Sequence, residues 1–195
     1  DTVATGFALA ITLRKVAVRA GVCDGFIGNR ILAATRKVAD YMLIDGASPT
    51  QIDDALEAFG FAMGPYRVLD MAGLDISWAN RKRQAATRPA NERYVAVGDR
   101  LCEMGAFGRK SGQGYYLYDD KGGLNPSLTD IVSAERAAHN VKPRSFDADE
   151  IVSRYIAAMV CEATRVLEDG IALRPIDVDA VLLFGYGFPR YRGGP

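Results

Sequence analysis

The sequence predicts a mainly α-helical fold made of two repeated helical units that pack against each other as a pseudo-dimer. The first observation is spacing: from residue 27 to residue 42, apolar side chains recur every three or four positions, as on one face of a helix. They are Ile27, Ile31, Ala34, Val38 and Met42. The second observation is an internal repeat, in which the segment from Asn29 resembles the segment from Ser153. Helical units of this size bury their apolar faces by packing against a neighbour.

The first part of the chain differs from the rest. Residues 2–13 predict a helix, and residues 15–21, which alternate around Val16 and Val18, predict one short strand. A single helix and a single strand do not form a sheet. We therefore expect residues 1–24 to be the end of a domain whose remainder precedes them, and the chain to be a piece of a longer protein.

Start and stop signals predict a series of helices after residue 25. Ser48 and Gln51 can form a capping box with Pro49 in the first turn, and Gly46 is typical of a helix C-terminus. The segment "GRKSGQGYYLY" predicts a turn that leads into a short extended piece. We expect helices near residues 26–45, 48–59, 65–72, 74–88 and 91–104, and a linker at 119–146 with at most two helical turns.

The repeat extends beyond apolar spacing. At one constant offset Arg30 aligns with Arg154, and the Asp-Gly pair at residues 45–46 aligns with the pair at residues 169–170. The sequence "FGF" of the first copy then meets "FGYGF" of the second, and both copies end in Gly-Pro. The exception is Ser153, which stands where the first copy has Asn29. This difference is expected if only one copy keeps a chemical role, whereas the shared arginine is expected to be structural.

Composition excludes several classes of function. The 195 residues carry a formal net charge of zero, so no overall field attracts nucleic acid or an anionic membrane. No apolar run approaches the roughly 18 residues of a membrane span. Cys23, Cys102 and Cys161 are too far apart to suggest a metal site or a disulfide framework, and His139 is the single histidine. A reducing, cytoplasmic compartment fits this cysteine usage.

Three stretches, in order and spacing, resemble a known family. They are "GFIGNRI" from Gly25, "DGASPTQIDDALEAFGFAMGPYRVLDMAGLD" from Asp45, and "GRKSGQGYYLY" from Gly108. Together they resemble the C-terminal helical domain of the 3-hydroxyacyl-CoA dehydrogenases. The segment "VCEATRVLEDGIALRPIDVDAVLLFGYGFPRYRGGP" resembles the second such domain of the multifunctional enzymes of fatty-acid β-oxidation.

The resemblance implies a division of the chain and a role for it. Residues 1–24 would be the remnant of a Rossmann domain and a hinge, 25–118 the first helical domain, 119–146 the linker and 147–195 a second, truncated repeat. In this family the upstream domain binds NAD and supplies a catalytic histidine with its glutamate partner. The helical domain closes over the acyl-CoA substrate, and an enoyl-CoA hydratase region is fused or associated. The fragment alone is then expected to be inactive.

The resemblance also implies site residues. Asn29 is the expected catalytic residue, because its amide can donate a hydrogen bond to the substrate carbonyl or hold the catalytic imidazole. Met63 and Pro65 are expected to lie near the acyl chain, and Tyr115 and Tyr116 to be core residues. No residue of this chain is expected to bind NAD or a metal. "GRKSGQG" follows a helix and precedes an extended piece, which is the wrong context for a dinucleotide fingerprint.

Two alternatives remain. The region can be a non-catalytic helical oligomerisation module of a related hydroxyacid dehydrogenase, in which case the second copy occupies the place of a partner subunit. It can also be the helical domain of another hydroxyacid dehydrogenase family, although the glycine-tyrosine turn argues against that. In a eukaryote, a peroxisomal or mitochondrial location replaces the cytoplasm.

Overall fold

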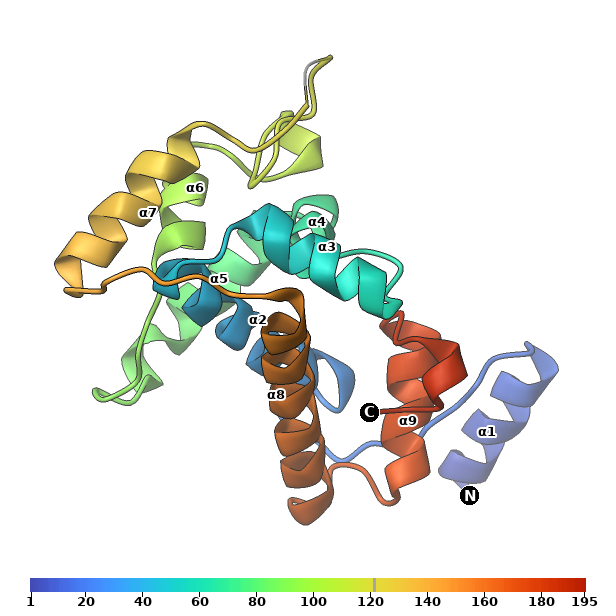
Figure 1. Ribbon diagram of the computed structural model, residues 1–195. Coiled ribbons are helices and arrows are strands. Elements are labelled where there is room, and N and C mark those ends of the chain that lie inside the picture. Colours follow the sequence, from blue (N-terminus) through green and yellow to red (C-terminus); the bar gives the residue numbers. More distant parts are fainter. Residues whose placement is uncertain (121) are drawn as a thin grey trace. The chain divides into compact units, whose positions relative to one another are not determined.

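The computed structural model of the chain describes residues 1–120 and 122–195; Lys121, which belongs to the predicted linker, lies outside them. In this described part the protein has α-helices and no strand, which confirms the prediction of a mainly α-helical fold. The helices are α1 (Thr2–Thr12), α2 (Gly28–Asp45), α3 (Pro49–Phe59), α4 (Pro65–Ala72), α5 (Leu74–Gln84), α6 (Val97–Glu103), α7 (Ser127–Ala138), α8 (Ala148–Glu168) and α9 (Pro175–Gly185) (Figure 1). Short 3₁₀ turns follow three of these helices: η1 (Ala85–Thr87) follows α5, η2 (Arg109–Ser111) follows α6 and η3 (Arg190–Arg192) follows α9.

The chain forms two compact units, and neither is one continuous segment. Unit 1 contains residues 1–36, 59–62 and 153–195, and unit 2 contains residues 37–58 and 63–152. Helices α2 and α8 each contribute residues to both units. The boundaries expected from the repeat (1–24, 25–118, 119–146 and 147–195) stay a prediction.

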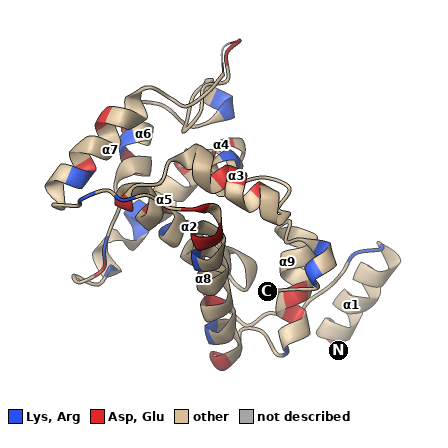
Figure 2. Cartoon of the chain, viewed as in Figure 1, with Lys and Arg blue, Asp and Glu red and all other residues tan. Residues whose placement is uncertain are grey.

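The first residues of unit 1 make few contacts. Helix α1 has no buried residue and no charged side chain along its length (Figure 2). The prediction of a strand at residues 15–21 is wrong, because this segment is extended without a ladder partner. Its one backbone bond to a distant residue runs from the Gly21 amide to the carbonyl of Ile171, at 2.8 Å. A strand needs a neighbour to satisfy its backbone, and a single bond does not supply one.

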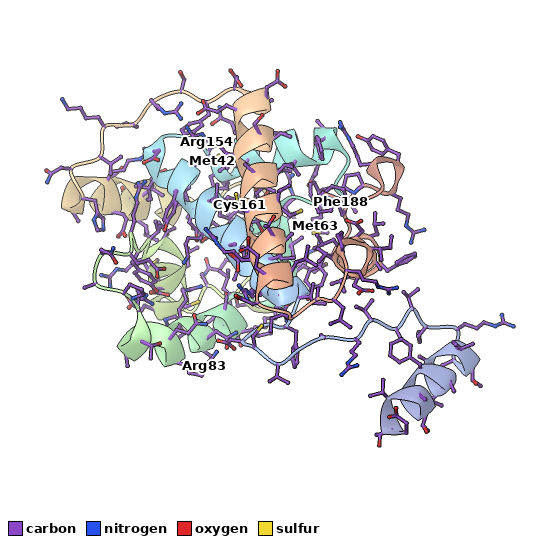
Figure 3. All side chains as sticks on the ribbon, turned by 90° about the horizontal axis from the view of Figure 1, so that it is seen from below. Met42, Met63, Arg83, Arg154, Cys161 and Phe188 are labelled. Atoms are coloured by element: carbon purple, nitrogen blue, oxygen red, sulfur yellow. The ribbon has the colours of Figure 1, made fainter. Side chains whose placement is uncertain are left out.

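The core of unit 1 brings segments of both repeats together. Ile31 from α2 and Val166 from α8 are fully buried. Phe61 packs edge-on against Phe188, with ring centroids 5.6 Å apart, and Phe188 (labelled in Figure 3) is 3% exposed. Phe61 also packs edge-on against Tyr155 of α8, at 5.9 Å. Edge-to-face aromatic pairs of this kind add to the free energy gained from burial.

Unit 2 follows the predicted helix signals closely. The Ser48 hydroxyl accepts a bond from the Gln51 amide at 3.1 Å, and the Gln51 side chain accepts one from the Ser48 amide at 2.9 Å. This reciprocal pair is the capping box expected at the start of α3. Pro65 is the first residue of α4. Helix α6 lies beside both α5 and α7 (Figure 1).

Two helices in unit 2 depart from the prediction. The helix expected at 91–104 begins only at Val97. The preceding Glu92 and Arg93 lie outside it and make ion pairs with Lys37 and Asp45 of α2. The predicted linker contains α7, which at 12 residues exceeds the two turns expected. This helix is stabilised by burial of apolar side chains one turn apart, Leu128 and Val132.

Helix α8 begins before Ser153. The helix begins at Ala148, and the Asp147 carboxylate accepts a hydrogen bond from the Glu150 amide at 2.8 Å. An aspartate at this position satisfies an amide that has no partner within the helix. Ser153, which aligns with Asn29 in the repeat, therefore lies inside α8, whereas Asn29 lies in the first turn of α2.

Candidate substrate-facing site

Asn29 is the second residue of α2, and its side chain is exposed. The chain turns sharply just before it: Gly25 and Phe26 both have left-handed backbone angles, with φ of 83° and 49°. The Arg30 amide then bonds back to the Gly25 carbonyl at 3.3 Å. This turn presents Asn29 on the surface of unit 1 while the following apolar residue, Ile31, enters the core.

The carboxamide of Asn29 is held by a residue of the second repeat. The hydroxyl of Tyr186 donates a hydrogen bond to Oδ1 of Asn29 over 2.8 Å. The ring of Tyr186 lies directly against Gly28, so closely that a β-carbon at Gly28 would overlap the ring atoms. Glycine is therefore required at the first position of α2 for this contact. Tyr186 itself is half-buried, and burial raises the pKa of its phenol.

Arg30, next to Asn29, has a structural role. Its Nε lies 2.6 Å from a carboxylate oxygen of Glu162, and one terminal nitrogen lies 2.8 Å from Asp169. The hydrogen bond to Glu162 raises the pKa of the guanidinium above its ordinary value. Burial raises the pKa of Glu162, but the bonds from Arg30 and Arg165 outweigh it and leave the pKa below its ordinary value. Arg30 thus connects the start of α2 to α8, as the repeat predicted for a shared arginine.

Met63 and Pro65, the other two predicted site residues, belong to unit 2. Pro65 is buried, and Met63 is half-buried. Between them, Gly64 packs so closely on the backbone of Asp53 that a β-carbon there would overlap it. Of the two, only Met63 has a side chain with surface to offer a ligand. The substrate-binding role expected for both residues stays a prediction.

A buried carboxylate fixes this turn. Asp53 is fully buried and accepts hydrogen bonds from the Tyr66 and Arg67 amides, at 2.9 and 3.2 Å, in the first turn of α4. The Tyr116 hydroxyl donates a third bond at 2.7 Å. Burial raises the pKa of Asp53 to about 6, against the opposite effect of these three bonds. Tyr116 and its neighbour Tyr115 are 9% and 2% exposed, so both are core residues, as expected.

The glycine-rich turn does not fit a dinucleotide. β-Carbons at Gly108 and Gly114 would overlap Asp70 of α4, so these glycines allow close packing against a helix. The Asp70 carboxylate accepts bonds from the Tyr115 and Tyr116 amides, both at 2.9 Å. Backbone amides that would cradle a phosphate are thus already bound to a protein carboxylate. The packing of this turn on Asp70 therefore differs from that of a dinucleotide-binding loop.

Other types of site find no support in the described part of the chain. No group of three or more histidine, cysteine, aspartate or glutamate side chains there is placed to hold a metal ion. His139 is half-exposed and lies 3.5 Å from Glu135, one turn earlier along the chain. Cys23, Cys102 and Cys161 are all free. Among the helices of residues 1–120 and 122–195, none has the length and apolar character needed to span a membrane.

Tyr186 is the site residue that the sequence analysis missed. Its signal was present, because "FGYGF" in the second copy contains a Tyr-Gly pair that "FGF" in the first copy lacks. The added pair indicates a local change in one copy but does not show which residue it contacts. That information requires the fold, since Tyr186 and Asn29 are 157 positions apart in the chain.

Comparison with known proteins agrees with this geometry. Residues 25–118 match the family described as "3-hydroxyacyl-CoA dehydrogenase, C-terminal domain". The whole chain aligns with the peroxisomal bifunctional enzyme of Cavia porcellus at 45% identity and with that of Homo sapiens at 42%. It also aligns with the fatty acid oxidation complex subunit alpha of Acinetobacter baylyi at 34% identity. The chain spans 29% of the length of the Cavia porcellus protein and 28% of the Acinetobacter baylyi protein.

Solved structures have the same fold. The dehydrogenase part of multifunctional enzyme 1 from C. elegans superposes with a TM-score of 0.70 at 26% identity, over 99% of this chain and 44% of that one. The 3-hydroxybutyryl-CoA dehydrogenase from Escherichia coli K12 gives a TM-score of 0.66 at 20% identity, over 93% of this chain and 54% of that one, and supports the fold alone. The chain therefore has the helical fold found in these dehydrogenase structures. Its residues 25–118, just under half of the chain, match the family of 3-hydroxyacyl-CoA dehydrogenase C-terminal domains, and the whole chain aligns with multifunctional relatives.

Proposed function

We propose that this chain is the substrate-facing helical part of an NAD-dependent 3-hydroxyacyl-CoA dehydrogenase of the multifunctional type. The reaction is the oxidation of a 3-hydroxyacyl-CoA to the 3-ketoacyl-CoA, in fatty-acid β-oxidation. The observation that carries the proposal is the exposed carboxamide of Asn29 in the first turn of α2, within a segment that matches this family. Met63 is proposed to contact the acyl chain, together with Pro65.

The chemistry of Asn29 follows from its donor atoms. The amide nitrogen carries two hydrogens, which can bond to the carbonyl oxygen of the acyl substrate or to the imidazole that removes the hydroxyl proton. A neutral donor of this kind holds the reacting carbon in place and stabilises charge that develops on an acceptor. NAD, the hydride acceptor, is proposed to bind a domain outside these 195 residues, because the glycine-rich turn of this chain packs against Asp70.

The test uses the complete enzyme that carries this chain. Asn29→Asp keeps the size of the side chain but removes its amide donor, and we expect kcat to fall roughly a hundredfold, as for the loss of one preorganised donor. Ser153→Ala is the matched control in the second repeat, because Ser153 is exposed and lies inside α8. Its kcat should equal that of the wild type. An Asn29→Asp enzyme with wild-type kcat would contradict the proposed role.

A second measurement concerns the chain by itself. The purified 195-residue protein, mixed with NAD and a 3-hydroxyacyl-CoA, should give no increase in NADH absorbance at any protein concentration. Catalysis needs a base and a bound cofactor, and both are proposed to come from the domain outside these 195 residues. Turnover by this chain alone would disprove the assignment of its role.

A role in assembly is supported by a separate observation. Phe61 and Phe188 occupy corresponding positions of the two repeats and pack on each other in unit 1, as residues near a two-fold axis do. We propose that the second repeat replaces a partner subunit, so that the chain is a pseudo-dimer. Sedimentation of the 195-residue protein should then give a monomer, whereas a tight dimer would exclude this arrangement.

The proposed pathway also suggests a compartment. The relatives include peroxisomal bifunctional enzymes and bacterial fatty acid oxidation subunits. We propose that the protein works in the cytoplasm of a bacterium or, in a eukaryote, in the peroxisome or mitochondrion. An enoyl-CoA hydratase region, fused or associated, is proposed as its partner in the multifunctional enzyme. The three free cysteines agree with a reducing compartment.

A further inference from the structure

We propose that Tyr186 is a positioning residue for Asn29, and that its hydroxyl fixes the carboxamide so that the NH₂ group remains available as a donor. This inference deepens the proposed function and rests on it, since it concerns the group that would contact the acyl substrate or the imidazole. Tyr186 acts through Asn29 and not on the substrate itself.

The direction of the hydrogen bond follows from the partners at hand. In the part of the chain that the structure describes, the hydroxyl of Tyr186 has one hydrogen-bond partner, Oδ1 of Asn29, at 2.8 Å. If the hydroxyl donates to Oδ1, its proton is satisfied and the NH₂ group of Asn29 points away from the ring. In the flipped carboxamide, the NH₂ group would face the hydroxyl, and the hydroxyl proton would lose its acceptor. The bond therefore selects one of the two amide orientations.

The ring is held in place independently of this bond. Gly28 leaves the space that the ring occupies, since a β-carbon there would overlap three of its atoms, Cε2, Cζ and the hydroxyl oxygen. The backbone of Tyr186 is anchored at the end of α9, where its amide donates to the Leu182 carbonyl at 3.2 Å. Two residues later, Phe188 is buried and packs on Phe61. The hydroxyl thus extends from a fixed base, which reduces the entropy lost in forming the bond.

The two repeats differ at both ends of this contact. The first copy has Asn29, where the second has Ser153; the second copy has the added Tyr186-Gly187 pair, where the first has none. Gly187 has a φ of 69°, so the added pair forms a turn that a residue with a β-carbon would strain. The amide and the hydroxyl that binds it therefore occur on opposite copies, each at a place where the repeat is broken. A residue that only filled space would not require both departures.

The closing experiment pairs two conservative variants. Tyr186→Phe keeps the ring against Gly28 and removes only the hydroxyl. Tyr191→Phe is the matched control, because the Tyr191 hydroxyl also comes from the second repeat and donates to the Phe59 carbonyl at 2.7 Å. In the complete enzyme, Tyr186→Phe should lower kcat about fivefold, the rate equivalent of one neutral hydrogen bond, with KM within about twofold. Tyr191→Phe should leave both constants unchanged.

A second readout observes the carboxamide without catalysis. In ¹H–¹⁵N spectra of the 195-residue protein, the side-chain NH₂ pair of Asn29 is assigned by its absence in Asn29→Asp. This pair should shift in Tyr186→Phe and stay in place in Tyr191→Phe. An NH₂ pair that is unchanged in Tyr186→Phe, or a raised KM with unchanged kcat, would overturn the positioning role. Full kcat in Asn29→Asp would instead refute the proposed function, and the catalytic purpose of the positioning with it.

Discussion

The ion pairs of Arg30 give the sharpest test of what holds unit 1 together. In Arg30→Met, the long side chain is kept and the guanidinium is removed, so two contacts of 2.6 and 2.8 Å are lost. The side chains of Arg30 and Glu162 are 20% and 13% exposed, so the first pair is largely shielded from solvent. Asp169 is 57% exposed, and a pair of that kind contributes little.

The magnitude follows from this difference in exposure. A hydrogen bond to a charged group contributes about 1.5–3 kcal/mol. Arg165 still pairs with Glu162 at 3.0 Å after the change, so the carboxylate is not left alone and the lower part of that range applies. We therefore expect the free energy of unfolding to fall by about 2 kcal/mol, which in a chain of this size lowers Tm by roughly 4–8 °C.

Urea unfolding followed by far-ultraviolet circular dichroism measures this loss. The matched control is Arg100→Met. The Arg100 guanidinium lies 2.8 Å from a Glu103 carboxylate oxygen, a distance similar to those of the Arg30 pairs, but these two side chains are 58% and 49% exposed. We expect the control to cost clearly less than Arg30→Met, because solvent screens an exposed pair. Equal losses for the two variants, or no coupling between Arg30→Met and Glu162→Gln in a double-mutant cycle, would refute the reasoning from burial.

Two further predictions concern unit 2. The pKa of Asp53 is raised from 3.8 to about 6, so below pH 4 the carboxyl is protonated in both states, and between about pH 4 and 6 only the folded state retains the proton. This proton contributes at most about 3 kcal/mol of stability, which is lost as pH rises through 6, so a plot of unfolding free energy against pH should slope downward there. Asp53→Asn should remove that slope. A slope that persists unchanged in the variant would show that other groups cause it. Gly64→Ala should destabilise the protein by more than about 2 kcal/mol in thermal unfolding, because its β-carbon overlaps the Asp53 backbone. Gly6→Ala, with open space around its site, should change stability by less than about 1 kcal/mol, and equal effects of the two changes would contradict this account.

Local signals predicted the elements whose stability is local. The capping box of Ser48 and Gln51 and the proline at the start of α4 lie within one helical turn of the groups they satisfy. The strand expected at residues 15–21 failed because a strand depends on a neighbour that the pattern does not contain. The full length of helix α7 was not predicted, because its buried apolar side chains, Leu128 and Val132, lie among polar residues.

The candidate site was predictable only in part for the same reason. Asn29 stood out because it differs from Ser153 in a repeat that is otherwise matched. The buried state of Pro65 and the bond from Tyr186 depend on which segments meet in three dimensions, and no spacing in the sequence reports that. Pairs separated by more than a hundred positions, such as Arg30 and Glu162, are set by tertiary packing.

The discontinuity of unit 1 has a consequence for biosynthesis. Unit 2 is complete once residue 152 has been made, whereas unit 1 needs residues 153–195 in addition to residues 1–36. On the ribosome, Asn29 is therefore synthesised long before Tyr186. Its carboxamide lacks this hydrogen bond until Tyr186 has been made and has folded against it. Contacts of such long sequence separation form late in folding. We expect a nascent chain stalled before α9 to carry a folded unit 2 while the contact between Asn29 and Tyr186 is still unformed, so Asn29 is positioned only after unit 1 has closed.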